Sequence, residues 1–228
     1  MVPVITIDGP SGTGKGTIAG MVAEQLGWHC LDSGALYRVL GLAAQRRGID
    51  LDAAGTLAEL AAALPVTFTS DGRVLLAGED VSDAIRTEAA GTAASRVAVH
   101  GPVRRRLLDW QRQAARPPGL VADGRDMGTV VFPQAQVKIF LDASPETRAM
   151  RRYKQLKEKG LDANLANLVE EIRLRDERDR NRSVAPLKAA EDAFVLDTSP
   201  FSIEEVLDRV MKAVDAAMPG LREKWVGG

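Results

Sequence analysis

Residues 9–17 combine the side chains that point most directly to chemistry. They read Gly-Pro-Ser-Gly-Thr-Gly-Lys-Gly-Thr, with Lys15 directly after the third glycine. Phosphates need several donors at close range, and glycine lets successive backbone N–H groups turn toward one anion. The Lys15 ammonium adds a mobile positive charge. We therefore expect the phosphates of a nucleoside triphosphate to bind at Gly9, Pro10, Ser11, Gly12, Thr13, Gly14, Lys15, Gly16 and Thr17.

The elements on either side of this loop are those that a phosphate loop needs. A β-branched run at Val4–Ile7 precedes it, and apolar residues at helical spacing follow over Thr17–Leu26. The helix directs the positive end of its dipole at the loop. A plain glycine turn is the alternative, which the lysine disfavours. The match departs from the general pattern at Gly16, where Ser or Thr is expected; the hydroxyl comes one residue later, at Thr17.

A candidate metal ligand ends the apolar run Leu120–Asp123. An aspartate there places a carboxylate at the carboxyl edge of a parallel sheet, where a phosphate loop also opens. Asp123 could instead cap a helix in a turn, but its combination with the loop favours a functional role. We expect Asp123 and Thr17 to hold Mg²⁺, directly or through water. Arg125 follows closely enough to reach the same cleft.

The segment Leu31–Arg38 forms another junction of strand and helix. Asp32 or Ser33 either caps the helix or serves the site, and the spacing leaves both interpretations open. Arg38 lies about one turn into this helix, so it can reach over the same edge of the sheet.

Arginine is unusually dense along two expected helices, at Arg148, Arg151, Arg152, Arg173, Arg175, Arg178, Arg180 and Arg182. Acidic residues four positions away, as in Asp176–Arg180, are typical of a solvated helix, which is the ordinary explanation. Against it, the apolar stripe of Leu165, Leu168 and Ile172 continues at helical spacing into Arg175, Asp179 and Arg182. A charged inward face is expected where a helix overhangs a polar cleft, and phosphoryl transfer uses such arginines.

Strand-like runs alternate with helical stretches, which predicts an α/β fold with a parallel sheet covered on both faces. We expect strands at Val4–Ile7, Trp28–Leu31, Leu120–Asp123, Val137–Leu141 and Phe194–Leu196. We expect helices at Thr17–Leu26, Leu36–Arg47, Ala53–Leu64, Pro102–Arg116, Pro145–Glu158, Leu165–Asn181 and Ile203–Ala217. An apolar hairpin at 66–77, turning at Asp71-Gly72 with a third strand near 78–81, indicates a small antiparallel insert.

The composition excludes several classes of protein. The 228 residues carry a net charge of −1, which gives no reason to expect a nucleic-acid partner. No apolar run reaches the roughly 18 residues of a membrane span, and no leader precedes the first strand, so we expect a cytoplasmic protein. Cys30 is the only cysteine, and we expect a packed structural thiol. His29 and His100 lack zinc-ligand spacing.

Four segments together resemble the bacterial cytidylate kinase family, in order and with matching lengths between them: 9–17, Leu31–Arg38, Ala122–Pro133 and Arg175–Arg182. Gly-Lys-Gly-Thr is the form of the loop in nucleoside-monophosphate kinases. The resemblance, over about residues 3–210, implies the P-loop nucleoside-monophosphate kinase fold with five parallel strands, a mobile lid and an antiparallel β insert. It implies one domain, with a core at about 1–32, 91–144 and 183–218, a monophosphate-binding lobe at 33–90 with the insert at 65–85, and a lid at 145–182.

The resemblance also assigns roles. It implies transfer of the γ-phosphate of ATP to CMP or dCMP with Mg²⁺, by a monomer without nucleic-acid or membrane partners. Lys15, Arg125, Arg151 and Arg182 would be catalytic, with Arg151 as a lid arginine that closes on the transferring group. The cytosine would meet Ser33, Ser95, Arg104 and Asp126, with Arg105 or Arg106 as alternatives to Arg104. Arg38, Arg125 and Arg182 would hold the acceptor phosphate, and Arg175 with Asp179 the sugar.

Two other functions would also use a phosphate loop. A kinase of another small acceptor, such as UMP, AMP or shikimate, would share the loop but differ at Ser33, Arg104 and Asp126. A GTPase-type switch would need Ser or Thr directly after Lys15 and an Asn-Lys-x-Asp motif; the first position is Gly16 and the motif is absent.

Overall fold

The structure, a computed structural model, describes residues 2–69, 72–158, 160 and 162–221. The chain divides into two compact units, one formed by 1–31 with 114–228 and the other by 32–113. Each unit has its own apolar core. The predicted division into core, lobe and lid is a functional one and stays a prediction.

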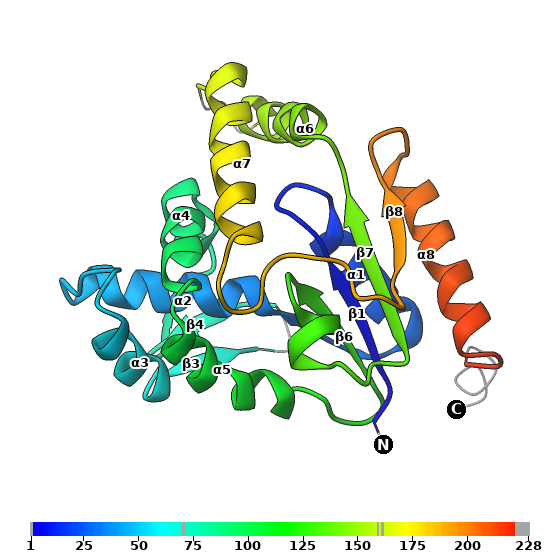
Figure 1. Ribbon diagram of the computed structural model, residues 1–228, viewed down its shortest axis with the longest axis horizontal. Coiled ribbons are helices and arrows are strands. Elements are labelled where there is room, and N and C mark those ends of the chain that lie inside the picture. Colours follow the sequence, from blue (N-terminus) through cyan, green and yellow to red (C-terminus); the bar gives the residue numbers. More distant parts are fainter. Residues whose placement is uncertain (1, 70–71, 159, 161, 222–228) are drawn as a thin grey trace. The chain divides into compact units, whose positions relative to one another are not determined.

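The first unit is built on a five-stranded sheet with the strand order β2-β6-β1-β7-β8 (Figure 1). The strands are β1 (Val4–Asp8), β2 (His29–Asp32), β6 (Leu120–Gly124), β7 (Val137–Asp142) and β8 (Phe194–Asp197). The central strand β1 pairs in parallel with β6 and β7, and Ile7 lies opposite Asp123. The carboxylates that end β1 and β6 therefore lie at one edge of the sheet, as expected for parallel strands.

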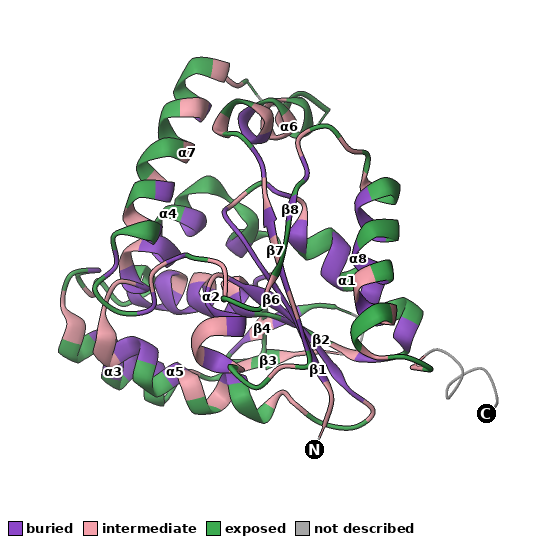
Figure 2. Cartoon of the chain, turned by 45° about the vertical axis from the view of Figure 1, so that its right-hand side comes forward, coloured by how far each residue is buried: buried purple, intermediate pink, exposed green. Residues whose placement is uncertain are grey.

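Burial of the central strands explains their nearly continuous apolar sequences. Every residue of β1 and β6 is buried, and both strands are purple in Figure 2. The apolar sides of α1 (Lys15–Leu26) and α8 (Ile203–Ala217) join the sheet residues in one core cluster. A capping box at Ser202 begins α8.

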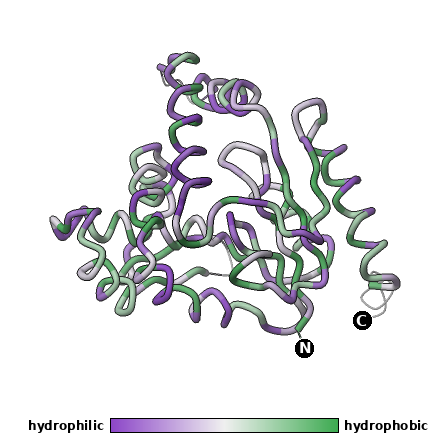
Figure 3. The backbone as a smooth tube through the Cα atoms, viewed as in Figure 1, coloured by the Kyte–Doolittle hydropathy of each residue, from purple (hydrophilic) through white to green (hydrophobic). Residues whose placement is uncertain are grey.

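Two further helices of this unit, α6 (Pro145–Glu158) and α7 (Leu165–Arg180), pack against each other. Their bounds agree with the prediction to within a residue. Ser144 caps α6 by accepting a hydrogen bond from the Thr147 N–H at 3.1 Å. Figure 3 shows that α7 is hydrophilic over most of its length, and its buried residues are Leu168, Asp176 and Asp179. One short turn, η2 (Met127–Val131), follows β6.

The second unit is mainly helical. Its helices are α2 (Ser33–Arg46), α3 (Ala54–Ala62), α4 (Glu88–Val97) and α5 (Gly101–Gln113), with a short turn η1 (Ala84–Arg86). The predicted antiparallel insert is confirmed as a three-stranded sheet of β3 (Val66–Phe68), β4 (Val74–Leu76) and β5 (Glu79–Asp80). Asp71 of the predicted turn lies outside the described residues.

The fold class is therefore as predicted: an α/β protein with five parallel strands, helices around them and a small antiparallel sheet. Several details were wrong. The first helix begins at Lys15 and not at Thr17, and α2 begins at Ser33 and not at Leu36. The α5 helix ends at Gln113, before the Pro117-Pro118 pair that disfavours helix. Cys30 is exposed, not packed. No helix in the described part of the chain is long and apolar enough to cross a membrane.

Close contact between α2 and α4 gives a prediction for the second unit. A Cβ atom at Gly41 would lie 2.9 Å from the Ala93 Cβ, so Gly41→Leu must push the two helices apart. We expect a loss of about 1–3 kcal/mol in the free energy of unfolding. Gly55→Leu in α3 is the control, because nothing lies within 4 Å of a Cβ at Gly55. Urea unfolding would measure both, and equal stability of the two variants would contradict the prediction.

Candidate active site

The phosphate loop, residues 9–17, leads from β1 into α1. Gly12 and Gly14 have φ angles of +83° and +88°, a left-handed backbone conformation that residues other than glycine rarely adopt. No side chain caps the start of α1, and its first turn contains no acidic residue. An anion bound there would take the place of the missing cap. A Cβ at Gly9 would lie 2.0 Å from the Leu141 carbonyl oxygen, so the loop begins tightly against β7.

Lys15 lies between the loop and the edge of the sheet. Its ammonium donates a hydrogen bond to the Pro10 carbonyl at 3.2 Å and lies 3.9 Å from Oδ1 of Asp123. The Thr13 hydroxyl donates to the same carbonyl. The lysine is therefore held over the loop, close to where phosphates would bind.

Gly16, the departure from the general loop pattern, has a steric reason. A Cβ at this position would lie 3.0 Å from Oδ2 of Asp123, which is itself buried. Ser or Thr here would therefore require the Asp123 carboxylate to move by a few tenths of an ångström. The expected hydroxyl belongs to Thr17, which is exposed at the next position of α1.

The residues near Lys15 suit Mg²⁺. Asp123 and Thr17 offer a carboxylate and a hydroxyl, the hard oxygen donors that this ion prefers. Among the described residues, no cluster of three or more His, Cys, Asp or Glu side chains could hold a metal. A magnesium ion bound here would thus share its coordination with nucleotide phosphates and water, as is usual in phosphoryl-transfer sites.

Asp8, the last residue of β1, is a site residue that the sequence analysis missed. Its two carboxylate oxygens accept hydrogen bonds from the backbone N–H groups of Met127 at 2.9 Å and Gly128 at 2.8 Å. Burial raises the pKa of Asp8 to about 7, with Asp126 and Asp123 adding to the rise and the two hydrogen bonds opposing it. The available signal was its position at the end of an apolar strand, the pattern that identified Asp123.

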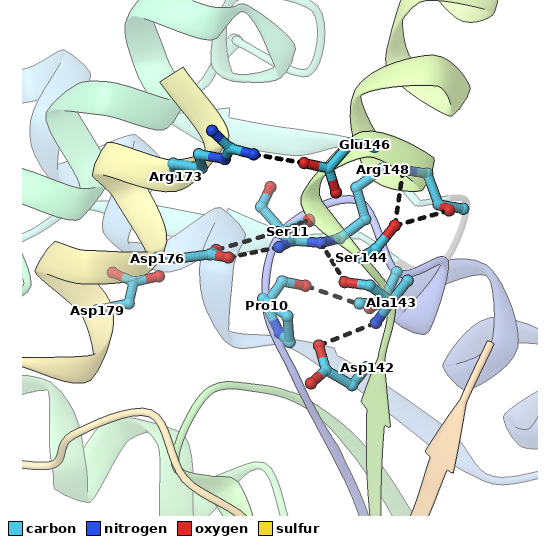
Figure 4. Close-up of polar contacts among 12 residues, drawn as sticks. Pro10, Ser11, Asp142, Ala143, Ser144, Glu146, Arg148, Arg173, Asp176 and Asp179 are labelled. Atoms are coloured by element: carbon cyan, nitrogen blue, oxygen red, sulfur yellow. Dashed lines mark hydrogen bonds and ion pairs between the residues drawn. The ribbon is translucent and has the colours of Figure 1, made fainter. Parts of the chain in front are cut away.

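A buried ion pair joins α6, α7 and the phosphate loop (Figure 4). The side chain of Arg148 is fully buried and forms a bidentate pair with Asp176 of α7. Its guanidinium also donates to the Ala143 carbonyl at 2.9 Å and to the Ser11 carbonyl at 3.0 Å. One arginine therefore connects the two helices to the backbone of the loop.

This pair decides between the two explanations of the arginine-rich helices. Asp176, expected on a solvated helix beside Arg180, is instead buried against α6. Asp179 and Arg182 are buried as well. The solvated-helix explanation is wrong for this face of α7. Arg173 is exposed, but it pairs with Glu146 of α6, drawn at the top of Figure 4.

A second group of arginines in the first unit surrounds the Asp179 carboxylate. Arg125 donates from Nε to Asp179 Oδ2 at 3.1 Å, and Arg182 pairs with the other oxygen. Burial alone would raise the pKa of Asp179, but Arg125, Arg182 and Arg175 together hold it below its usual value. The structure thus brings together three of the predicted acceptor-binding arginines around the ionised carboxylate of Asp179, itself a predicted site residue.

Arg151 of α6 contacts the phosphate loop and Thr198. It donates to the Thr198 carbonyl at 2.6 Å, to the Thr198 hydroxyl at 3.1 Å and to the Thr13 carbonyl at 3.4 Å. Burial lowers the pKa of this guanidinium, and Asp197 opposes the change. Its predicted role on the transferring group stays a prediction, and would require these bonds to be exchanged for phosphate.

The remaining predicted residues belong to the second unit, except Asp126, which is buried in the first beside η2. Ser33 is the buried first residue of α2, capped by Asp32, and Ser95 is buried on α4. Arg38 donates to the Ile85 carbonyl at 2.9 Å. Arg104 is buried with its guanidinium 5.5 Å from the centre of the Tyr37 ring.

The Arg148–Asp176 pair generates a prediction about stability. Replacing Arg148 with Met leaves Asp176 buried without its partner, which should cost about 3–5 kcal/mol in the free energy of unfolding. The double variant Arg148→Met with Asp176→Leu should recover part of this loss, because no unpaired charge remains. Arg173→Met is the matched control, since its pair is exposed and should have little effect. If Arg148→Met were as stable as Arg173→Met, the buried Arg148–Asp176 ion pair would not hold these segments together.

Asp8 gives a prediction about pH. The Asp8 carboxyl group keeps its proton up to about pH 7 in the folded protein but loses it near pH 3.8 in the unfolded chain. The contribution of Asp8 to the free energy of unfolding therefore falls as the pH rises from 3.8 to about 7. Asp8→Asn cannot titrate. The stability of the variant relative to the wild type should therefore rise with pH from about 4 to 7, by an amount on the order of 4 kcal/mol. A difference that stays constant over this range would contradict the prediction.

The chain is similar to known proteins over most of its length. The family model described as "Cytidylate kinase" matches residues 5–216. A cytidylate kinase of Aeromonas hydrophila is 61% identical over 214 residues, which cover 92% of this chain and 93% of that protein. One of Photobacterium profundum is 58% identical over 95% of this chain and 96% of that protein. A solved structure of an uncharacterized protein from Eubacterium ventriosum is similar in fold alone. It is 11% identical, with a TM-score of 0.51, and the match covers 95% of this chain and 99% of that one. The chain belongs to the cytidylate kinase family.

Proposed function

We propose that this chain transfers the γ-phosphoryl group of ATP to CMP or dCMP, giving ADP and CDP or dCDP. The observation that carries the proposal is the charge arrangement of the first unit. A glycine-rich loop with Lys15 lies in the same unit as a buried group in which Arg125, Arg175 and Arg182 surround Asp179. Such an arrangement suits a reaction in which two phosphate groups must be brought together against their mutual repulsion.

On the donor side, residues 9–17 would bind the ATP phosphates through backbone N–H groups. Lys15 would follow the negative charge that moves onto the bridge between the β- and γ-phosphates. Thr17 and Asp123 would hold Mg²⁺, which neutralises charge on these phosphates when it is bound.

On the acceptor side, the phosphate of CMP is already an oxyanion, so no strong general base is needed. Arg38, Arg125 and Arg182 would neutralise and orient it, and Arg151 would join them when the lid at 145–182 closes. Asp179 would accept hydrogen bonds from the sugar beside Arg175, and its lowered pKa keeps it ionised for this role.

The base would be read by Ser33, Ser95, Arg104 and Asp126. Cytosine offers an amino donor beside two acceptors, whereas uracil reverses the pattern at two of the three positions. A carboxylate suits the amino group and a guanidinium suits the acceptors. Membership of the cytidylate kinase family agrees with this choice of base. Nothing in the site favours UMP, AMP or shikimate as acceptor, or a GTPase-type switch. The proposal includes a monomeric enzyme in the cytoplasm.

The proposal predicts that CMP accelerates the formation of ADP from ATP. A coupled ADP assay with CMP, dCMP, UMP, AMP and shikimate tests it, and the wild type should prefer the cytidine nucleotides by at least about tenfold. Equal rates with all acceptors, or none with CMP, would refute the function.

Lys15→Met should lower kcat by about 10²–10³, because the neutral side chain cannot follow the moving charge. Lys212→Met, which removes an exposed lysine of α8 paired with Asp208, is the control. Circular dichroism would establish that both variants fold. A Lys15→Met enzyme with nearly the wild-type rate would show that the loop is wrongly assigned.

A further inference from the structure

The turn that carries Arg125 and Asp126 is held by a residue from a different strand. Met127 and Gly128 are the first residues of η2, and their N–H groups are the ones that a helical turn leaves without internal partners. Asp126 stands in the capping position but makes no capping hydrogen bond to η2. The two oxygens of Asp8 accept these N–H groups instead, across 119 residues of sequence.

This arrangement has a consequence for Asp126. A carboxylate just before a helical turn ordinarily folds back to cap it. In this turn Asp8 supplies the cap from another strand. The backbone of Asp126 is fixed as well, since its carbonyl accepts hydrogen bonds from the Val130 and Val131 N–H groups.

The backbone around the contact between Asp8 and η2 is tightly packed. A Cβ at Gly128 would lie 2.8 Å from the Thr6 hydroxyl oxygen, so the start of η2 packs directly against β1. On the other side of Asp8, Gly9 is pressed against the Leu141 carbonyl, which fixes the beginning of the phosphate loop. The loop and the Arg125–Asp126 turn are therefore anchored at the same point of β1.

We propose that Asp8 is a positioning residue for the acceptor nucleotide: its carboxylate sets the turn that presents Arg125 to the phosphate and Asp126 to the base. This inference rests on the proposed function. It predicts that loss of the carboxylate impairs the use of CMP and leaves the binding of ATP intact, although Asp8 is next in sequence to the ATP loop.

Asp8→Asn at pH 8 is the first test, because the amide has nearly the same size but turns an N–H₂ group toward one backbone N–H. We expect kcat/KM for CMP to fall by about 10²-fold, as for a comparable misplacement of reacting groups. The Kd of ATP, measured by equilibrium binding, should stay within about twofold, and the preference for CMP over UMP should narrow.

Asp192→Asn is the matched control. Asp192 pairs with Lys138, whose side chain packs beside Gly128, so this variant changes the charge near η2 without touching the Asp8 contacts. It should keep the wild-type kcat/KM for CMP. A role of Asp8 in stability alone would lower the unfolding temperature of Asp8→Asn and leave the KM for CMP and the base preference unchanged, which would overturn the proposal.

If the wild-type enzyme fails to use CMP, the proposed function is wrong. If the wild type uses CMP and Asp8→Asn has the same kcat/KM for CMP, only the role proposed for Asp8 is wrong. Asp8→Ser, which keeps one acceptor without a buried charge, serves if Asp8→Asn does not fold. If neither folds, hydrogen exchange of the nucleotide-free wild type decides. The Met127 and Gly128 amides should be protected, and exchange at the rate of an unstructured peptide would overturn the proposal.

Discussion

The arrangement of α6, α7 and the phosphate loop depends on one buried guanidinium. Removing Arg148 and Asp176 from water costs several kcal/mol for each charge, and only well-formed hydrogen bonds offset such a cost. Arg148 meets this condition by donating to Asp176 and to the carbonyls of Ser11 and Ala143 at once. A small shift of any of these segments would leave a buried charge incompletely paired. The pair therefore enforces a geometry more than it adds stability, which suits a site that must align two phosphates.

Two buried carboxylates of the same unit show how their partners determine their charge. Asp179 is surrounded by arginines and has a lowered pKa, whereas Asp8 has backbone N–H partners and two acidic neighbours, and its pKa rises to about 7. Burial acts in the same direction on both. The arginines thus keep a negative charge on Asp179, where we propose that the sugar binds, whereas Asp8 gains or loses its proton near pH 7.

The sequence allowed the strands to be predicted closely, because each is a short apolar run that ends at turn or polar residues. It also identified the residues around Asp179, through the charged continuation of an apolar stripe. Contacts between distant segments were not predictable. Asp176 was paired with Arg180 by helical spacing, although its partner comes from another helix, and Asp8 was overlooked because the turn it caps is far along the chain. Local patterns carry no information about such partners. The α4 helix was not among the helices predicted from the sequence.

Cys30 was expected inside the protein, but it lies exposed on β2, which is an edge strand of the five-stranded sheet. Because the chain has a single cysteine, it cannot close a disulfide within itself, and any disulfide to another copy must link the two chains through this strand. Edge strands also present backbone groups that can pair with a second sheet. A disulfide between two copies would thus place its crosslink next to Leu31, where the chain leaves the first unit for the second.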